Sequence, residues 1–223
     1  MGIYGVRADG GGEARRLADL TTGVFPASVS PGGRLAIWDF AVGNAIWTAP
    51  LESGPDGLRL GKADLFLQTR FDPPITARTE AAFSPDGRWM AYSSPETGQI
   101  ELYVRPFRGP GGNTPISTTG GTHPVWSRHG HELFYVDRYT KKLMVVSYKI
   151  TGDSFVPGEP TVWCEKPIFD FGELYSYDVA PDGKRVAVVL YPDGTAQQKP
   201  ATSLTFLRNF FDELKRRLPS NPN

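Results

Sequence analysis

Ser-Pro-Asp-Gly-Arg-Trp-Met-Ala-Tyr, residues 84–92, is the stretch that decides the fold of this chain. Asp-Gly between two apolar runs is a strong local signal for a β-hairpin, and a proline just before it fixes its own φ and starts the turn. Phe83 stands before the turn and Met90 to Tyr92 stand after it. The segment therefore predicts two antiparallel strands joined by a tight type I′ turn.

Three further copies of this unit lie along the chain. Residues 180–188 read Ala-Pro-Asp-Gly-Lys-Arg-Val-Ala-Val, residues 30–38 are a looser copy, and residues 127–135 are a degenerate copy, Ser-Arg-His-Gly-His-Glu-Leu-Phe-Tyr. Successive glycines of the unit lie 54, 43 and 53 residues apart. Propeller blades of the WD and kelch types repeat at about 40–50 residues. A third and a fourth short apolar run follow most copies, and four antiparallel strands per repeat are typical of a blade.

The sequence thus predicts an all-β protein, a β-propeller of four-stranded antiparallel blades with four repeats plus a partial blade and a short C-terminal helix. Residues 1–219 are expected to form a single propeller domain or fragment, since all-β domains of roughly 200–250 residues often form one unit. The predicted blades cover residues 1–20 (partial), 25–68, 78–118, 122–165 and 174–208, the helix covers 210–217, and 220–223 form a disordered tail.

Composition excludes several classes of protein. The 223 residues carry 24 Lys and Arg against 24 Asp and Glu, a net charge of +0, which argues against a nucleic-acid partner because such proteins present a basic surface. No apolar run approaches the ~20 residues that span a bilayer, and the N-terminus lacks the apolar core of a signal peptide. Cys164 is the one cysteine, so no intrachain disulfide forms.

Motifs for catalysis are missing from the sequence. It has no Gly-x-Ser-x-Gly nucleophile elbow, no phosphate-binding loop and no kinase catalytic loop, and Asp170-Phe171-Gly172 stands alone and is interpreted as a loop between blades. His129-Gly130-His131-Glu132 resembles a metal cluster, but it occupies the turn that Asp86-Gly87 occupies in the better copy. We therefore expect no catalytic residues, no metal site and no cofactor.

The predicted binding residues are Arg78, Glu80, His123, Tyr175 and Tyr177. In a propeller the first strand of each blade lines a central channel, and by register these residues lie at the beginnings of such strands. They are polar or aromatic, as recognition surfaces are. The competing interpretation is that they satisfy local backbone groups and do nothing more.

The repeat resembles that of the TolB propeller. Residues 82–107, Pro124 to Ser127 and the terminal stretch 206–219 (Phe-Leu-Arg-Asn-Phe-Phe-Asp-Glu-Leu-Lys-Arg-Arg-Leu-Pro) are most similar to propellers at the C-terminus of bacterial serine/threonine protein kinases. That resemblance implies an extracytoplasmic, periplasmic location in a bacterium. TolB-like propellers usually have six or more blades, whereas this chain supplies four and a part.

Function is predicted from these features together. We expect a non-enzymatic module that binds or scaffolds a protein or peptide partner, and the resemblance implies the sensor or docking part of a signalling kinase. Two alternatives remain open: a propeller that gates a peptidase or hydrolase in a longer chain, and a metal-dependent propeller hydrolase that uses Glu80 and His123. No nucleic acid and no membrane insertion by this segment are expected, while unpaired blade edges would allow self-association.

Overall fold

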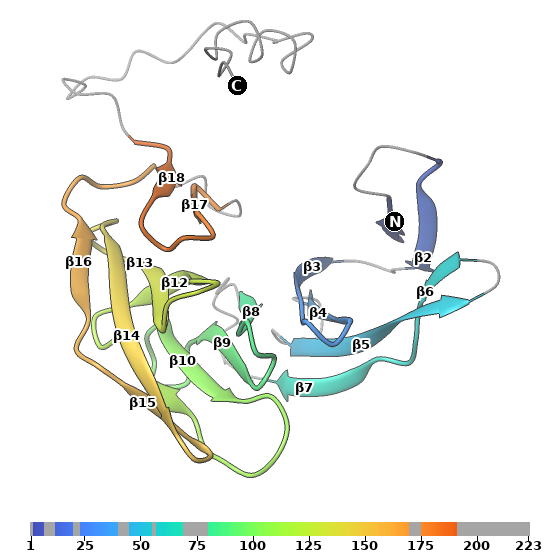
Figure 1. Cartoon of the computed structure of the whole chain (residues 1–223), viewed down its shortest axis with the longest axis horizontal. Helices are drawn as coiled ribbons and strands as arrows, with labels where there is room; N and C mark the ends of the chain where they lie inside the picture. The colour runs from blue at the N-terminus through green and yellow to red at the C-terminus, as the bar shows by residue number, and fades with distance from the viewer. Residues whose placement is uncertain are drawn as a thin grey trace, which may run out of the picture. The chain divides into compact units, whose positions relative to one another are not determined.

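A computed structural model of the chain describes residues 2–6, 12–19, 23–39, 45–54, 57–68, 80–169 and 175–190. Every regular element among these residues is a strand (Figure 1). The strands are β1 Gly2–Gly5, β2 Arg15–Asp19, β3 Val24–Val29, β4 Arg34–Asp39, β5 Ala45–Gly54, β6 Gly57–Leu60, β7 Asp64–Gln68, β8 Ala81–Phe83, β9 Trp89–Ser94, β10 Glu101–Pro106, β11 Thr114–Pro115, β12 Gly121–Trp126, β13 Glu132–Asp137, β14 Leu143–Thr151, β15 Ser154–Pro157, β16 Thr161–Cys164, β17 Tyr177–Val179 and β18 Val186–Val188.

Three sheets have the four-stranded antiparallel order of a propeller blade. They are β3-β4-β5-β7, β8-β9-β10-β11 and β12-β13-β14-β16, in which each strand pairs with the next of its blade. In two of them a long third strand also forms a side hairpin, β5 with β6 and β14 with β15. The two-stranded sheet β1-β2 precedes these three sheets in the sequence, and the two-stranded sheet β17-β18 follows them. The all-β propeller prediction is confirmed.

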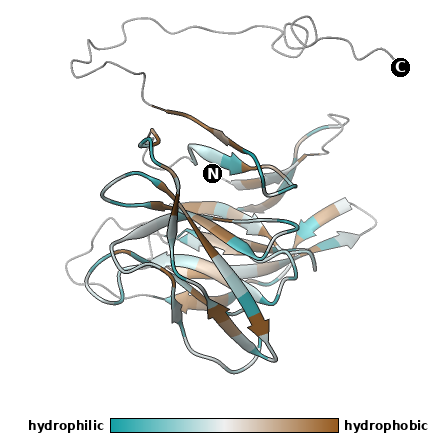
Figure 2. Ribbon diagram, turned by 60° about the vertical axis from the view of Figure 1, so that its left-hand side comes forward, coloured by the Kyte–Doolittle hydropathy of each residue, from teal (hydrophilic) through white to brown (hydrophobic). Residues whose placement is uncertain are grey.

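Each hydrophobic cluster joins two successive sheets. In β9, Trp89 and Ala91 belong to the cluster shared with the β12–β16 sheet, whereas Met90 and Tyr92 belong to the cluster shared with the β3–β7 sheet. Neighbouring residues of a strand point to opposite faces, so β9 is covered on both faces and all six of its residues are buried. Figure 2 shows both hydrophobic (brown) and hydrophilic (teal) residues along the strands. Packing of successive sheets face to face is the arrangement of propeller blades.

The turn inside the repeated unit differs from the predicted type I′. Gly87 has a φ of +69°, and its N–H donates to the carbonyl of Ser84 at 2.9 Å. Asp86 has no positive φ. Among the described non-glycine residues, positive φ occurs at His123 and Lys141. The turn is therefore a type I turn with proline at its second position and a left-handed glycine at its fourth. A type I′ turn would need positive φ at both central residues, and Pro85 with its fixed negative φ excludes that.

Several predicted features lie outside the described residues. They are the C-terminal helix over 210–217, the tail 220–223, the last strands of the 174–208 blade, and Arg78 of the predicted site. In the part of the chain that is described, no helix is long and apolar enough to cross a membrane.

Candidate functional site

The first strands of successive sheets lie next to one another. β8 contacts β3 on one side and β12 on the other, and β12 in turn contacts β17. Side chains connect the backbones of these strands: the N–H of Phe83 donates to Ser28 Oγ at 3.1 Å, and the Trp126 indole donates to the carbonyl of Ala82 at 3.0 Å. The strands that begin each sheet therefore form one continuous wall.

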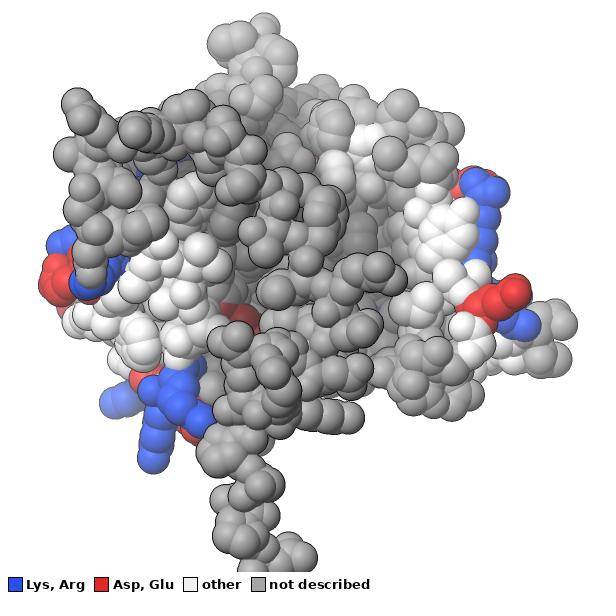
Figure 3. Space-filling model, turned by 90° about the horizontal axis from the view of Figure 1, so that it is seen from above, with Lys and Arg blue, Asp and Glu red and all other residues white. Residues whose placement is uncertain are grey.

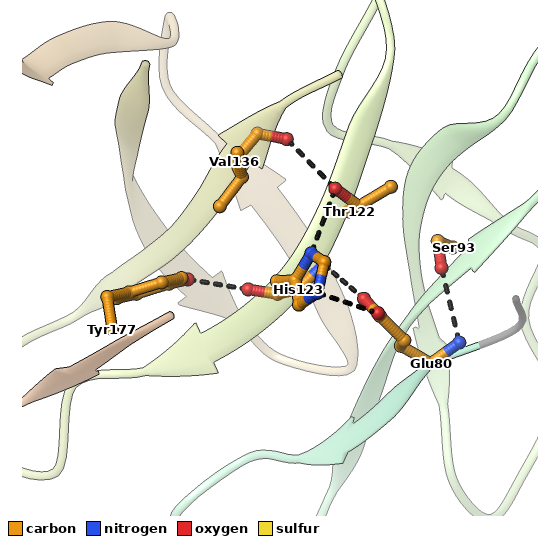
Figure 4. Close-up of polar contacts among 6 residues, drawn as sticks. All are labelled: Glu80, Ser93, Thr122, His123, Val136 and Tyr177. Carbon is orange, nitrogen blue, oxygen red and sulfur yellow. Dashed lines mark hydrogen bonds and ion pairs between the residues drawn. The ribbon is translucent and has the colours of Figure 1, made fainter. Parts of the chain in front are cut away.

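Glu80 and His123 meet where β8 and β12 begin (Figure 4). Glu80 Oε1 lies 3.2 Å from His123 Nε2, and the backbone N–H of His123 donates to Glu80 Oε2. Both side chains are about nine-tenths buried. The other ring nitrogen, Nδ1, lies 3.1 Å from Thr122 Oγ1. The Glu80 carboxylate thus binds the backbone N–H of His123 and lies beside its imidazole, which ties the β8 sheet to the β12 sheet.

The backbone of His123 is in the left-handed region, with a φ of +57°. The pairing of β12 with β13 shifts register between Thr122 and Val125, which is a β-bulge. Bulges occur beside functional sites because they redirect a side chain, and here the bulge directs the His123 N–H toward Glu80. A non-glycine residue in this region carries strain that its surroundings must offset.

Two tyrosines from the start of the last described sheet complete the cluster. The Tyr177 hydroxyl donates to the carbonyl of His123 at 2.5 Å, and the Tyr175 ring stands edge-on to the His123 ring with centroids 5.0 Å apart. Burial raises the pKa of the Tyr177 hydroxyl well above its ordinary value, and Tyr175 and the Glu80 carboxylate raise it further. Tyr177 therefore remains a neutral hydrogen-bond donor across the physiological pH range.

An open groove of about 680 Å³ runs beside this cluster. Its walls are residues of β3, β8 and β12 and the short turns that follow them, and Tyr175 lies at the end near His123. Most of the lining is apolar or small and uncharged. The lining residues are Ala27 to Pro31, Ala81 to Pro85, Pro124 to Trp126, Arg128 and Tyr175.

The structure brings together four of the five predicted site residues, Glu80, His123, Tyr175 and Tyr177. Whether they bind a ligand remains a prediction. The sequence analysis did not anticipate the roles of Ser28 and Trp126 in joining the strands, nor the place of Arg128 on the groove. The sequence held one signal for Trp126, since an indole N–H needs an acceptor when it is buried.

The contacts within the cluster are hydrogen bonds, one close carboxylate–imidazole pair and one edge-on ring contact. Among the described residues no group of three or more His, Cys, Asp or Glu comes together as metal ligands. Glu80 and His123 form a pair, and both imidazole nitrogens have close polar neighbours. On the face shown in Figure 3, Lys and Arg side chains lie beside Asp and Glu side chains toward the margins of the described surface, and one acidic patch lies nearer the middle.

No family model matches the sequence, and no curated protein matches it closely enough to count as a relative. Solved structures do match. A TolB structure from Agrobacterium tumefaciens is 19% identical with a TM-score of 0.53 and covers 86% of this chain. TolB from Acinetobacter baumannii is 15% identical with a TM-score of 0.56 and covers 84% of this chain. A structure described as a 6-phosphogluconolactonase from Bacteroides uniformis is 14% identical and covers 83% of this chain and 56% of its own, with a TM-score of 0.47.

The chain spans 66% of the Agrobacterium protein and 42% of the Acinetobacter protein. At these identities the likeness extends to the fold and not to what the proteins bind, because one fold carries many functions. The order of the sheets, the clusters between them and the two TolB structures agree: this chain has the fold of a TolB-like β-propeller.

Proposed function

We propose that this chain is a non-enzymatic binding module whose groove along β3, β8 and β12 receives a protein or peptide partner. The single observation that carries the proposal is the groove itself, about 680 Å³ in volume, lined by three first strands and bordered by the Glu80–His123 cluster. Ligand sites are concave, largely apolar and provided with a few placed polar groups. The groove has that character.

The rigidity of the wall supports the same function. The hydrogen bonds from the Phe83 N–H to Ser28 Oγ and from the Trp126 indole to the Ala82 carbonyl fix neighbouring strands, and Tyr177 fixes the start of the last described sheet to His123. A site held on rigid elements binds with a smaller loss of conformational entropy than a mobile one. The two TolB structures add support at the level of the fold.

Selection of phage-displayed random peptides on the purified protein tests this proposal. Val29 lines the groove with 55% of its surface exposed, so Val29→Trp would fill the groove without disturbing the core. Val156, 47% exposed on the β14–β15 hairpin away from the groove, provides the matched control Val156→Trp. We expect selected peptides to bind the wild type and the control and to lose at least about ten-fold in affinity on Val29→Trp. A protein that selects no peptide, or peptides that ignore Val29→Trp, would contradict the proposal.

We propose further that the module is the docking or sensor part of an extracytoplasmic signalling kinase. What supports this is the resemblance of residues 82–107 and 206–219 to propellers that follow such kinases. Reading the coding sequence upstream of Met1 is the direct test. A kinase domain followed by a membrane span supports this role, whereas a peptidase or hydrolase domain beside the propeller replaces it with a gating role.

A further inference from the structure

We infer that the groove selects an extended peptide segment that carries a carboxylate, and that Arg128 recognises this carboxylate. The inference rests on the proposed function, because it names the partner chemistry of the same groove. Arg128 is the one charged residue among the described residues that line the groove. Its side chain is exposed, and it has no hydrogen bond or ion pair to another described residue.

The position of Arg128 sets the direction and length of the segment. Arg128 follows Trp126 and Ser127 at the end of β12, whereas His123 with its neighbour Tyr175 lies near the beginning of that strand. Arg128 stands five positions after His123 in the sequence, which corresponds to at most roughly 16 Å at about 3.3 Å per residue of extended chain. A peptide segment of up to about five residues would therefore span from Tyr175 to Arg128.

The groove wall explains why side chains would determine the choice of peptide. β3, β8 and β12 are end strands of their sheets, and such edges usually bind peptides through backbone hydrogen bonds. Here the N–H of Phe83 and the carbonyl of Ala82 are already bonded to Ser28 and Trp126. These two backbone groups of β8 are therefore already used, and we expect apolar contacts with the wall and the charged contact at Arg128 to distinguish one peptide from another.

The charge of the groove favours a carboxylate over a phosphate. Guanidinium groups bind carboxylates through two parallel hydrogen bonds. Phosphorylated or strongly acidic motifs are recognised by clusters of arginines, whereas the described residues that line this groove include one arginine and no other charged residue. The carboxylate comes from an Asp or Glu side chain or from the C-terminus of the partner, and the experiment separates these sources.

Three matched bead libraries of pentapeptides, randomised with every amino acid except Asp and Glu, test the inference. One ends in a free C-terminal carboxylate, one ends in Asp amide, and the third, the neutral control, ends in Asn amide. We expect binders in the first or second library, the one that dominates identifying the source, and few in the third. In solution, fluorescence anisotropy of the best peptides should give affinities at least about ten-fold weaker for Arg128→Ala than for the wild type, with Arg128→Lys between them.

Arg108→Ala is the matched control variant, because Arg108 lies outside the groove lining and has no ion pair to a described residue. It should leave the affinities unchanged. Peptides that bind equally from all three libraries and ignore Arg128→Ala would overturn this inference and leave the proposed function standing. Failure of every library to bind would overturn both. Analytical ultracentrifugation of the same samples tests whether a second copy of this chain occupies the groove. Self-association that Arg128→Ala abolishes would also overturn the inference.

Discussion

His123 has the backbone conformation of a glycine and the side-chain contacts of a buried histidine. Its φ is +57°, and its ring touches Glu80 and Tyr175. Substitution by Gly and by Ala removes the ring contacts equally, but only Gly adopts the left-handed region without strain. We expect His123→Gly to be more stable than His123→Ala by about 1 kcal/mol, measured by urea unfolding. Equal stabilities would mean that the left-handed conformation is not retained in the variants.

Asp137 carries a charge that contributes to stability in a defined pH window. Burial acts to raise the pKa of Asp137, but hydrogen bonds from Thr140, Thr119 and the Tyr139 N–H outweigh it and hold the pKa below its ordinary value. A lowered folded pKa gives stability that is present above the unfolded value of about 4 and is lost as the pH falls through the folded pKa.

Asp137→Asn should therefore cost about 1–3 kcal/mol of unfolding free energy at pH 7. The difference from the wild type should shrink as the pH falls below about 4, where the unfolded aspartate becomes protonated. Urea unfolding at a series of pH values measures both quantities. A gap between the two proteins that stays constant down to pH 2 would show that the charge of Asp137 does not matter.

At the scale of the element, the turn of the repeated unit depends on one left-handed glycine. Gly87 has a φ of +69°, and a Cβ built there would lie 3.4 Å from Pro31 Cδ. Gly87→Ala should cost about 1–2 kcal/mol, chiefly through backbone strain. Gly112 has no positive φ and nothing within 4 Å of a built Cβ, so Gly112→Ala should change stability by less than about 0.5 kcal/mol. Thermal unfolding of Gly87→Ala and Gly112→Ala under the same conditions measures both changes in stability. Equal losses of stability would contradict the prediction.

The sequence predicted the presence of these hairpins better than their geometry. Asp-Gly after proline indicated a turn between two strands at residues 84–92, and β8 and β9 flank it. The predicted turn type was wrong. Pro85, the residue before Asp86, has a fixed negative φ, and a prediction made from Asp-Gly alone leaves this constraint out. The degenerate copy differs again: Gly130 lacks the positive φ, and its N–H donates to Ser127 Oγ instead of a carbonyl.

The candidate site was also predictable in part, because the repeated unit indicates where neighbouring strands begin. Register along repeated strands placed Glu80, His123 and Tyr177 at the beginnings of neighbouring strands, and the structure places them in contact. The bulge in β12 and the left-handed His123 were not predictable, because histidine has no preference for that backbone conformation comparable to that of glycine. The groove depends on the spacing between sheets, which a local pattern does not contain.

At the scale of the whole molecule, stability is shared between successive sheets. Leu102 of β10 and Leu133 of β13 are both fully buried in the cluster that joins the β8–β11 sheet to the β12–β16 sheet. Ile3 and Leu35 belong to a different cluster, which joins β1-β2 to the β3–β7 sheet. A cavity in the cluster that contains Leu102 and Leu133 should therefore destabilise both the β8–β11 and the β12–β16 sheets. Its effect on the stability of the β1-β2 sheet should be indirect.

Leu102→Ala tests this sharing. Removal of a fully buried leucine should cost about 2–5 kcal/mol, and native-state hydrogen exchange should show reduced amide protection in both β10 and β13, whose sheets meet at the lost side chain. Leu58→Ala is the matched control, since Leu58 is 40% exposed on β6 and lies outside that cluster. Its effect should be small and local to the β5–β6 hairpin. Protection lost from β10 while β13 stays unchanged would show that the two sheets unfold independently, and the cluster would then not join them into one cooperative unit.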